Sequence, residues 1–362
     1  MARRVRARVI REAAELDRYA SSWRTLEPNA TMPTQHFAWA RTGARAFGTL
    51  GRLHVVTVGE GDACTAVAPL VRTNGWSPRL ELLGMAGLFE PMDFLAADAA
   101  SLDRLAEGLA RQRTPLLLGR VPASSPTIPA LERAYSRRGW IRTAPGAPYP
   151  YVDVGPGWTE AAHFNSGRRS DFRRAARHAE EHGKVTYEIL TPTPAEVGPL
   201  LDEAFAVEAK SWKGEVGSAL AIDPMLGTFF RDYAAAAAAA GILRIAFMRI
   251  AGQAVAMQIA VECHNRFWLF KIGYDDQHGK ASPGALLMLH TLNHAAARGL
   301  ASYEFLGGAA PWTAAWTKQL RACVVIRAYP ISVSGAVGLG RDVAHWAVVR
   351  AKKRMQREPV RT

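Results

Sequence analysis

The sequence predicts a mixed α/β fold, with α+β mixed sheets, arranged as two tandem domains. Its 362 residues are enough for two domains that each bury a core of ordinary size. The same order of predicted elements occurs twice: strand, two helices, three strands, helix, strand, helix, strand. In the second copy, residues 267–299 combine a buried strand, a polar loop and a helix with clear ends, and we interpret the rest of the chain around them.

The strand of this stretch covers residues 266–274, of which six of nine are large and apolar or aromatic. This composition is typical of a strand buried on both faces, so we expect it at the centre of a sheet. The helix is predicted to begin at Ser282 as its N-cap, with Pro283 in the first helical position, and to end before Gly299.

The start of this helix has the properties of an anion-binding site. A helix N-terminus offers backbone N–H groups and the positive end of the helix dipole, and glycines let a ligand approach the backbone closely. The candidates for this contact are Gly279, Lys280, Ser282, Gly284 and Ala285. The alternative is a well-capped core helix that follows an ordinary loop.

The remaining predicted elements fill two similar halves. Those of the first half are residues 5–10, 12–26, 35–47, 52–58, 63–72, 80–83, 102–113, 115–119 and 128–139, with a strand and a linker in 140–154. Those of the second half are residues 166–182, 184–190, 195–212, 224–240, 243–250, 253–262, 302–306, 312–320 and 323–331. A basic amphipathic helix is expected over 341–357.

Composition indicates a globular protein, with 49% hydrophobic and 21% charged residues. The N-terminus lacks the apolar segment of a secretory signal, and no uncharged run is long enough to span a bilayer, so we expect a soluble, cytoplasmic protein. Cys64, Cys263 and Cys323 are odd in number and widely spaced, so we expect buried thiols and not a disulfide framework or a metal site.

The net charge of +13 is concentrated in residues 1–24, 166–184 and 341–362. Such patches suit polyphosphate ligands, RNA or an anionic membrane surface, and the alternative is solvated arms that keep the protein soluble. Few aromatic residues alternate with the arginines of 166–177, so we do not expect nucleic-acid binding there.

Four short segments carry a resemblance to a known family: the basic run 166–174, residues 208–214, Tyr274 with 282–284, and residues 303–308. Together with the order of elements they resemble the GNAT acyltransferase fold. Two such halves in tandem resemble the CelD/BcsL-type acyltransferases, which are related to the FemABX peptidyltransferases. The chain differs from that family at Glu304, where the family has Asp, and at Trp312 and Thr313, where it has Tyr and Lys.

The resemblance implies a degenerate N-terminal GNAT-like domain (1–158), a C-terminal GNAT acyltransferase domain (159–333) and a basic helical tail (334–362). It also implies an N-acyltransferase that uses acyl-CoA, such as acetyl-CoA, as co-substrate, without a metal. The expected acceptor is an amine of a sugar, cell-envelope or polysaccharide-related molecule. The alternatives are a FemABX-like aminoacyl-tRNA-dependent peptidyltransferase and a non-catalytic module that binds membrane or polyanion.

Direct acyl transfer to an amine requires a proton acceptor and a stabilised oxyanion. Glu208 is the first candidate, because it lies four residues before Trp212 on a predicted helix and an aromatic neighbour can raise its pKa. The alternative is a surface pair of Glu208 with Lys210 or Lys213. Glu304, at the end of a buried strand, is the second candidate carboxylate.

Tyr274 is the candidate acid toward the leaving thiolate. The candidates for contact with the acceptor substrate are Trp212, Lys213, Arg169, Arg173 and Trp316. His290 and His294 have the i, i+4 spacing of zinc ligands, but no third ligand is spaced around them, so no metal is expected. The basic tail suggests weak contact with an anionic lipid surface, at the inner face of the membrane.

Overall fold

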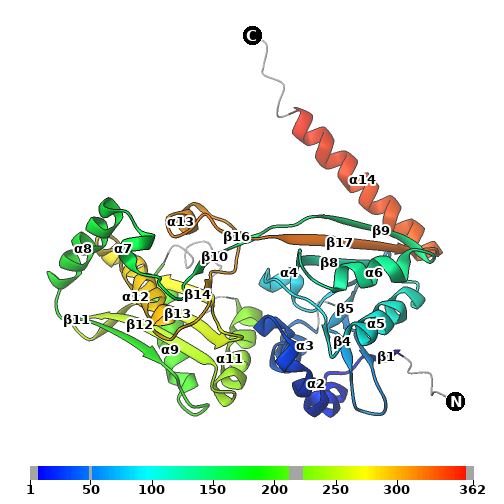
Figure 1. The fold of residues 1–362 in the computed structure, drawn as a ribbon, viewed down its shortest axis with the longest axis horizontal. Coiled ribbons are helices and arrows are strands. Elements are labelled where there is room, and N and C mark those ends of the chain that lie inside the picture. The colour runs from blue at the N-terminus through cyan, green and yellow to red at the C-terminus, as the bar shows by residue number, and fades with distance from the viewer. Residues whose placement is uncertain (1–6, 49–50, 212–222, 356–362) are drawn as a thin grey trace, which may run out of the picture.

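The computed structural model describes residues 7–48, 51–211 and 223–355, with only the backbone described for 351–355. Its helices and strands form two lobes that lie side by side (Figure 1). This confirms the predicted fold class of mixed α/β structure in two tandem halves. Among the described residues, no helix combines the length and apolarity needed to cross a bilayer.

The N-terminal lobe contains two sheets and the helices that pack on them. Its strands are β1 (Ala7–Ile10), β2 (Gly51–Leu53), β3 (Val55–Val58), β4 (Ala66–Ala68), β5 (Leu70–Thr73), β6 (Leu80–Leu82), β7 (Leu95–Ala96), β8 (Leu116–Pro122), β9 (Gly139–Pro145) and β17 (Cys323–Pro330). Its helices are α1 (Ala13–Leu16), α2 (Ala20–Leu26), α3 (Phe37–Phe47), α4 (Met85–Leu88), α5 (Ala99–Arg111), α6 (Thr127–Tyr135) and α14 (Val333–Met355), with short 3-10 turns η1 (Asp17–Tyr19), η2 (Glu27–Asn29) and η3 (Pro33–Gln35).

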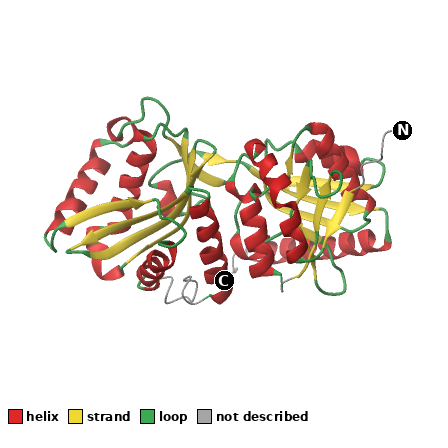
Figure 2. Cartoon of the chain, turned by 90° about the horizontal axis from the view of Figure 1, so that it is seen from below, coloured by secondary structure: helices red, strands yellow, loops and turns green. Residues whose placement is uncertain are grey.

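The C-terminal lobe is built on one seven-stranded sheet, with helices on both faces (Figure 2). Its strands are β10 (Tyr149–Asp153), β11 (Val185–Leu190), β12 (Leu243–Ile250), β13 (Gln253–Cys263), β14 (Arg266–Tyr274), β15 (Ser302–Glu304) and β16 (Leu320–Arg321). Its helices are α7 (Glu160–His163), α8 (Ser166–Glu180), α9 (Val197–Ala209), α11 (Pro224–Ala239), α12 (Pro283–Ala297) and α13 (Pro311–Ala314), with the 3-10 turn η4 (Asp276–Ala281).

The two lobes share one unusual feature of strand pairing. Each contains a single parallel pair among its described strands, β6 with β8 in the first lobe and β14 with β15 in the second, and the other pairs are antiparallel. A crossover connection joins the parallel strands in both lobes: α4, β7 and α5 lie between β6 and β8, and η4 and α12 lie between β14 and β15. The repeat that the sequence predicts is therefore also a repeat of topology.

The last strand of each half of the chain pairs with strands from the other half. Strand β10 ends the first half of the chain but pairs with β15, and β17 ends the second half but pairs with β8 and β9. Figure 1 shows β9 and β17 running along one side of the N-terminal lobe and reaching toward the C-terminal lobe near β16. The expected domain boundaries stay a prediction. A boundary at residue 159 would not, however, separate the strands of one sheet from those of another, because β10 and β17 each pair with strands on the other side of it.

An aromatic cluster fills the space between the lobes. Trp39 of α3 is 2% exposed and packs edge-on against Phe229 and Tyr233 of α11, with ring centroids 4.9 Å away in each case. It also stacks on Phe270 of the central strand β14, at 5.2 Å. Large buried rings of this kind stabilise an interface strongly, so the lobes form one packed body.

Several predicted elements are divided in the structure. The helix expected over 12–26 is α1, η1 and α2, and the strand expected over 52–58 is β2 and β3, which belong to different sheets. His54, between these two strands, donates its N–H to the oxygen of Leu70. The apolar pattern of 52–58 is continuous because both sheets bury it, so periodicity alone does not show the break.

Candidate active site

A cavity of about 760 Å³ lies where β14 and β15 move apart. The two strands pair only between Arg266–Trp268 and Ser302–Glu304. Beyond this point, residues 269–274 and 305–310 both line the cavity. Paired strands satisfy each other's N–H and C=O groups, so strands that separate can offer backbone groups to a bound molecule.

Both lobes line this cavity. The C-terminal lobe contributes the start of α12, and the N-terminal lobe contributes Leu88, which ends α4, and Glu90 just beyond it. A ligand in the cavity would therefore contact the two lobes at once. Sites at the junction of two domains are common for small ligands.

Glu90 is the only acid among the described residues that line the cavity. It is 6% exposed, and its Oε2 has no hydrogen-bond partner among the residues that the structure describes. Burial raises the pKa of this carboxyl to about 7, although Arg120, Lys271 and the N–H of Gly307 act in the opposite direction. Glu90 can therefore exchange a proton near neutral pH.

The backbone around this acid is held in an uncommon conformation. Phe89, Arg120 and Leu306 have φ angles of 54°, 53° and 56°, in the left-handed region that side chains rarely adopt. The buried guanidinium of Arg120 donates to the carbonyl oxygens of Phe89, Gly307 and Ala147, the last at 3.2 Å. Strained residues concentrate at functional sites, where the surrounding contacts fix them.

Ser282 occupies the N-cap position of α12, as predicted, but its side chain makes no capping hydrogen bond. Its φ of 47° and ψ of 51° are left-handed, whereas a capping side chain needs an extended backbone. Its carbonyl oxygen instead accepts the N–H groups of Ala285 and Leu286, at 2.9 and 3.1 Å. Ser282 lines the cavity.

Of the five residues predicted to bind an anion, Gly279, Ser282, Gly284 and Ala285 line the cavity. Lys280 is exposed and is not among the lining residues. Gly284 has a packing role as well, because a Cβ atom at this position would lie 3.1 Å from Cδ1 of Tyr274.

Tyr274 lines the cavity at the end of β14. Burial, together with the nearby Asp276, raises the pKa of its hydroxyl. The side chain therefore stays protonated at neutral pH, which is the state that a general acid requires.

Glu208 lies in α9 and is 1% exposed, but it is not among the residues that line the cavity. It packs behind β14, because a Cβ atom at Gly273 would lie 2.8 Å from the Cα of Glu208. Lys210, one of its expected alternative partners, pairs with Asp275 at 3.3 Å. Its role as the base stays a prediction.

Glu304 is fully buried and is not among the cavity-lining residues. Its carboxylate accepts hydrogen bonds from Arg321, at 2.8 Å, and from Ser302, at 2.6 Å, and lies 3.5 Å from Arg266. This arrangement is that of a buried ion pair that holds β15 and β16.

The predicted contacts to the acceptor substrate are divided. Trp316 lines the cavity, whereas Arg169 and Arg173 do not, and Trp212 and Lys213 lie outside the described residues. His290 and His294, at which no metal was expected, have other contacts: His294 bonds to Glu262 at 2.7 Å and His290 stacks on Tyr187.

Sequence reasoning missed Glu90, Arg168 and Lys271, which all line the cavity. Arg168 lies one turn before the buried Phe172, over whose ring its guanidinium sits at 4.7 Å, whereas Arg169 and Arg173 follow a different face of α8. Its position four residues before the aromatic Phe172 is a signal that could have distinguished Arg168 from the other arginines of α8. Glu90 is a single acid before a proline in the apolar segment 84–91, which is a weak signal.

Residues 166–313 match the acetyltransferase (GNAT) domain family. The C-terminal lobe is therefore similar to a GNAT domain. The match includes α8, the diverging strands and the start of α12, which are the parts of this lobe that line the cavity. No curated protein matches the sequence.

Solved structures similar to the whole chain show the same fold at low sequence identity. FemX has a TM-score of 0.56 at 12% identity, covering 90% of this chain and 97% of that chain. The C-terminal domain (DUF2156) of a protein named as a lysylphosphatidylglycerol synthetase from Agrobacterium fabrum has a TM-score of 0.57 at 13% identity, covering 92% and 96%. A conserved protein of unknown function from Bacteroides thetaiotaomicron has a TM-score of 0.54 at 13% identity, covering 91% and 100%.

Proposed function

We propose that the protein transfers an acyl group from acyl-CoA to an amine carried by a sugar or cell-envelope precursor. The observation that carries this proposal is the cavity that joins the start of α12 in the GNAT domain to Glu90 of the other lobe. A GNAT domain supplies the site of a thioester donor, and a buried carboxyl with a pKa of about 7 supplies a proton acceptor.

The donor would lie between the separated strands, with its phosphates at Gly279, Ser282, Gly284 and Ala285. The amine would attack the thioester carbonyl, and Glu90 would take the proton that the amine loses. Tyr274 would give its proton to the leaving thiolate of CoA. The reaction forms an amide bond and breaks the thioester bond, with no change of oxidation state.

Two features of the lining support a polar, ring-containing acceptor. Trp312 is 44% exposed, so its face can stack on a sugar ring, and Trp316 also lines the cavity. Arg168 adds a positive charge that suits an anionic group on the acceptor.

The experiment that tests the proposal has two steps. Isothermal titration with CoA and acetyl-CoA measures donor binding, and mass spectrometry then detects acylated products in a panel of amino sugars and envelope precursors. Donor binding followed by a product whose mass has increased by the acyl group is expected. An absence of binding to any acyl-CoA would contradict the proposal.

Aminoacyl-tRNA-dependent transfer is the second candidate, supported by the similarity to FemX and by the basic helix α8. It requires a much larger basic surface for the donor than acyl-CoA does. Incubation with charged tRNA and labelled amino acid separates the two candidates, since only one donor should yield a product.

Replacement of Gly284 with valine is expected to weaken CoA binding at least tenfold, or by about 1.4 kcal/mol. The new side chain would meet the ring of Tyr274, whose Cδ1 lies 3.1 Å from the place that a Cβ atom would occupy, and would fill the space where a phosphate approaches α12. Titration calorimetry measures the change. Gly340→Val is the matched control, because a Cβ at this helical glycine meets nothing within 4 Å. If folded Gly284→Val and the parent protein bound CoA with equal affinity, the phosphates of CoA would not bind at this loop.

We further propose that the tail makes peripheral contact with anionic membranes. Trp346 and Asp342 of α14 pack against the N-terminal lobe, through the guanidinium of Arg142 at 4.6 Å from the Trp346 ring and through Arg327 at 3.3 Å from Asp342. Val348, at 54% exposed, lies beyond these contacts. We therefore assign the proposed membrane contact to the basic residues that follow Val348 in the sequence.

Removal of residues 351–362, which carry five basic residues, is expected to abolish sedimentation with phosphatidylserine vesicles. Each basic residue near such a surface contributes about 1 kcal/mol, and salt of about 1 M should erase the binding of the full chain. The cut leaves the Trp346 and Asp342 contacts in place. Phosphatidylcholine vesicles are the control, and unchanged sedimentation of the shortened chain would contradict the proposal.

A further inference from the structure

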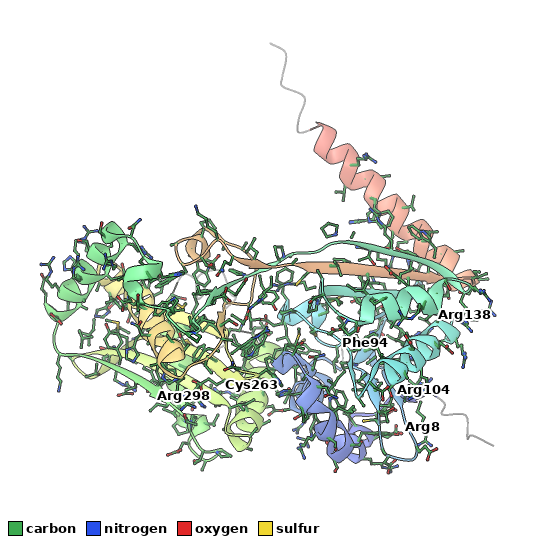
Figure 3. The ribbon with its side chains drawn as sticks, in the orientation of Figure 1. Arg8, Phe94, Arg104, Arg138, Cys263 and Arg298 are labelled. Carbon is green, nitrogen blue, oxygen red and sulfur yellow. The ribbon has the colours of Figure 1, made fainter. Side chains whose placement is uncertain are left out.

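Two histidines and a cysteine meet where the two lobes touch, away from the cavity end of β14. His36 precedes α3 in the N-terminal lobe, and Cys263 and His264 form the turn between β13 and β14 in the C-terminal lobe. One ligand atom from each of the three side chains lies within 4.8 Å of the others. Figure 3 labels Cys263, which lies in the region where the lobes meet.

The donor set matches one class of metal ion. Imidazole nitrogen and thiolate sulfur together are preferred by Zn²⁺ and related transition metals, whereas Mg²⁺ and Ca²⁺ require oxygen ligands. The three groups come from segments more than 200 residues apart, since His36 and His264 are separated by 228 positions. No search for ligands at short spacing would find them in the sequence.

The two imidazoles already point at each other. Their Nε2 atoms are 2.7 Å apart, the distance of a hydrogen bond between a protonated and an unprotonated ring nitrogen. Two nitrogen ligands of a tetrahedral zinc ion stand about 3.3 Å apart, given bonds of about 2.05 Å. A small rotation of either ring would therefore open space for the ion between them.

One acid and one arginine act on the cluster. Glu27 is the acid whose charge acts on both Cys263 and His264, and its Oε1 accepts the N–H of Phe37, next to His36. The nearby cation, Arg266, lies 3.5 Å from Glu304, which offsets its charge. The ligand atoms within 4.8 Å of one another are those of His36, Cys263 and His264, so a water molecule would fill the fourth position of the ion.

The turn itself is fixed before any metal binds. His264 and Asn265 have φ angles of 52° and 56°, and the indole N–H of Trp268 donates to the oxygen of Cys263 at 3.1 Å. Ligands held by a rigid second layer lose less freedom on binding. The β13–β14 turn therefore presents the thiol and one imidazole together.

We propose that His36, Cys263 and His264 bind one zinc ion, which fastens the N-terminal lobe to the central hairpin of the C-terminal lobe. Binding forms one Zn–S and two Zn–N bonds and releases the proton of the Cys263 thiol, without oxidation or reduction. The ion would have a structural role. The site is separate from the proposed acyl transfer, so either proposal can fail alone.

The test uses untagged, full-length protein that has been treated with a chelator. Titration with Co²⁺ is expected to give one ion per chain and the near-ultraviolet band of a cobalt–thiolate bond, which Zn²⁺ then removes. In Cys263→Ser the band should be absent, and in His36→Gln and His264→Gln the affinity should fall at least tenfold. Cys64→Ser and Cys323→Ser are the matched controls, because these two thiols are not part of the cluster and their loss should leave the band unchanged.

A second readout does not depend on the band. Excess Zn²⁺ should raise the Tm of the parent protein by roughly 5 °C or more and leave that of His264→Gln unchanged, while Mg²⁺ should shift neither. His264 is half-buried in the turn between β13 and β14, so this variant should fold even if Cys263→Ser does not. Weak Co²⁺ binding without a thiolate band, or a band that survives in Cys263→Ser, would overturn the proposal and leave only a hydrogen bond between two histidines.

Discussion

Replacement of Glu90 with glutamine is expected to lower kcat for acyl transfer by roughly two to four orders of magnitude. Glutamine keeps the size and much of the hydrogen bonding of the side chain but cannot accept the proton of the amine. The affinity for CoA should change little, because the proposed phosphate contacts are on the other lobe, at the start of α12. Steady-state kinetics and calorimetry on the same preparation check both expectations.

The pH profile identifies the group. A base with a pKa of about 7 is protonated below pH 7, so kcat/KM of the parent should fall as the pH drops through this value. In Glu90→Gln the residual activity should no longer show this fall in kcat/KM at low pH, the acidic limb of the profile. An unchanged limb in the variant would assign it to another group.

The pH dependence of the folding stability gives an independent test of the raised pKa of Glu90. The folded-state pKa of Glu90 is raised above its ordinary value, so this group favours folding at low pH and loses that contribution as the pH rises through about 7. Glu90→Gln should therefore gain stability relative to the parent above pH 7. Thermal unfolding at pH 5.5 and pH 8.5 measures the difference, where both values are chosen about 1.5 units from the pKa.

Glu208→Gln is the matched comparison, because it removes another buried carboxylate within the same region, behind β14. If Glu90 is the base, Glu208→Gln should keep the acidic limb of the profile, even where its packing against Gly273 alters the rate. A large loss of kcat with loss of that limb in Glu208→Gln, and a parental profile in Glu90→Gln, would return the role to Glu208.

The sequence was sufficient to predict the order of elements in each half and the position of the central strand. Residues 266–274 form β14 within the seven-stranded sheet, and the helix starting after Ser282 ends at Ala297, close to the predicted glycine stop. These features depend on local signals: an apolar run, a proline in the first turn and a glycine after the last.

What the sequence could not predict depends on contacts between the halves. The exchange of β10 and β17 requires knowing which sheet edge each strand meets, and neither strand contains that information in its own pattern. Glu90 becomes part of the cavity only because the N-terminal lobe lies against the separated strands of the other lobe. Similarly, His36 is a candidate metal ligand only because the fold places Cys263 and His264, between β13 and β14, beside it.

Glu304 shows how a correct local prediction can leave the role of a residue open. It lies at the end of a buried strand, as expected. Its hydrogen-bond partners are Ser302 of the same strand, β15, and Arg321 of β16. Its oxygens accept hydrogen bonds from arginine and hydroxyl donors, and it does not line the cavity where a substrate would lie.

Replacement of Glu304 with alanine is therefore expected to destabilise the protein by about 3–5 kcal/mol, because it leaves Arg321 and Arg266 without their buried partner. For a chain of this size, the Tm should fall by roughly 10 °C. At a temperature where the variant is folded, kcat should remain within a few-fold of the parental value, since the side chain does not line the cavity.

Glu203→Ala is the control for this experiment. Glu203 also holds an arginine through two hydrogen bonds, to Arg249 at 2.5 and 3.0 Å, but its side chain is 37% exposed, whereas that of Glu304 is 0% exposed. An exposed pair contributes about 1 kcal/mol or less, so Glu203→Ala should shift the Tm by only a few degrees. Similar stability losses in the two variants would argue against the buried ion pair. A stable Glu304→Ala protein that has lost turnover would instead make Glu304 part of the reaction.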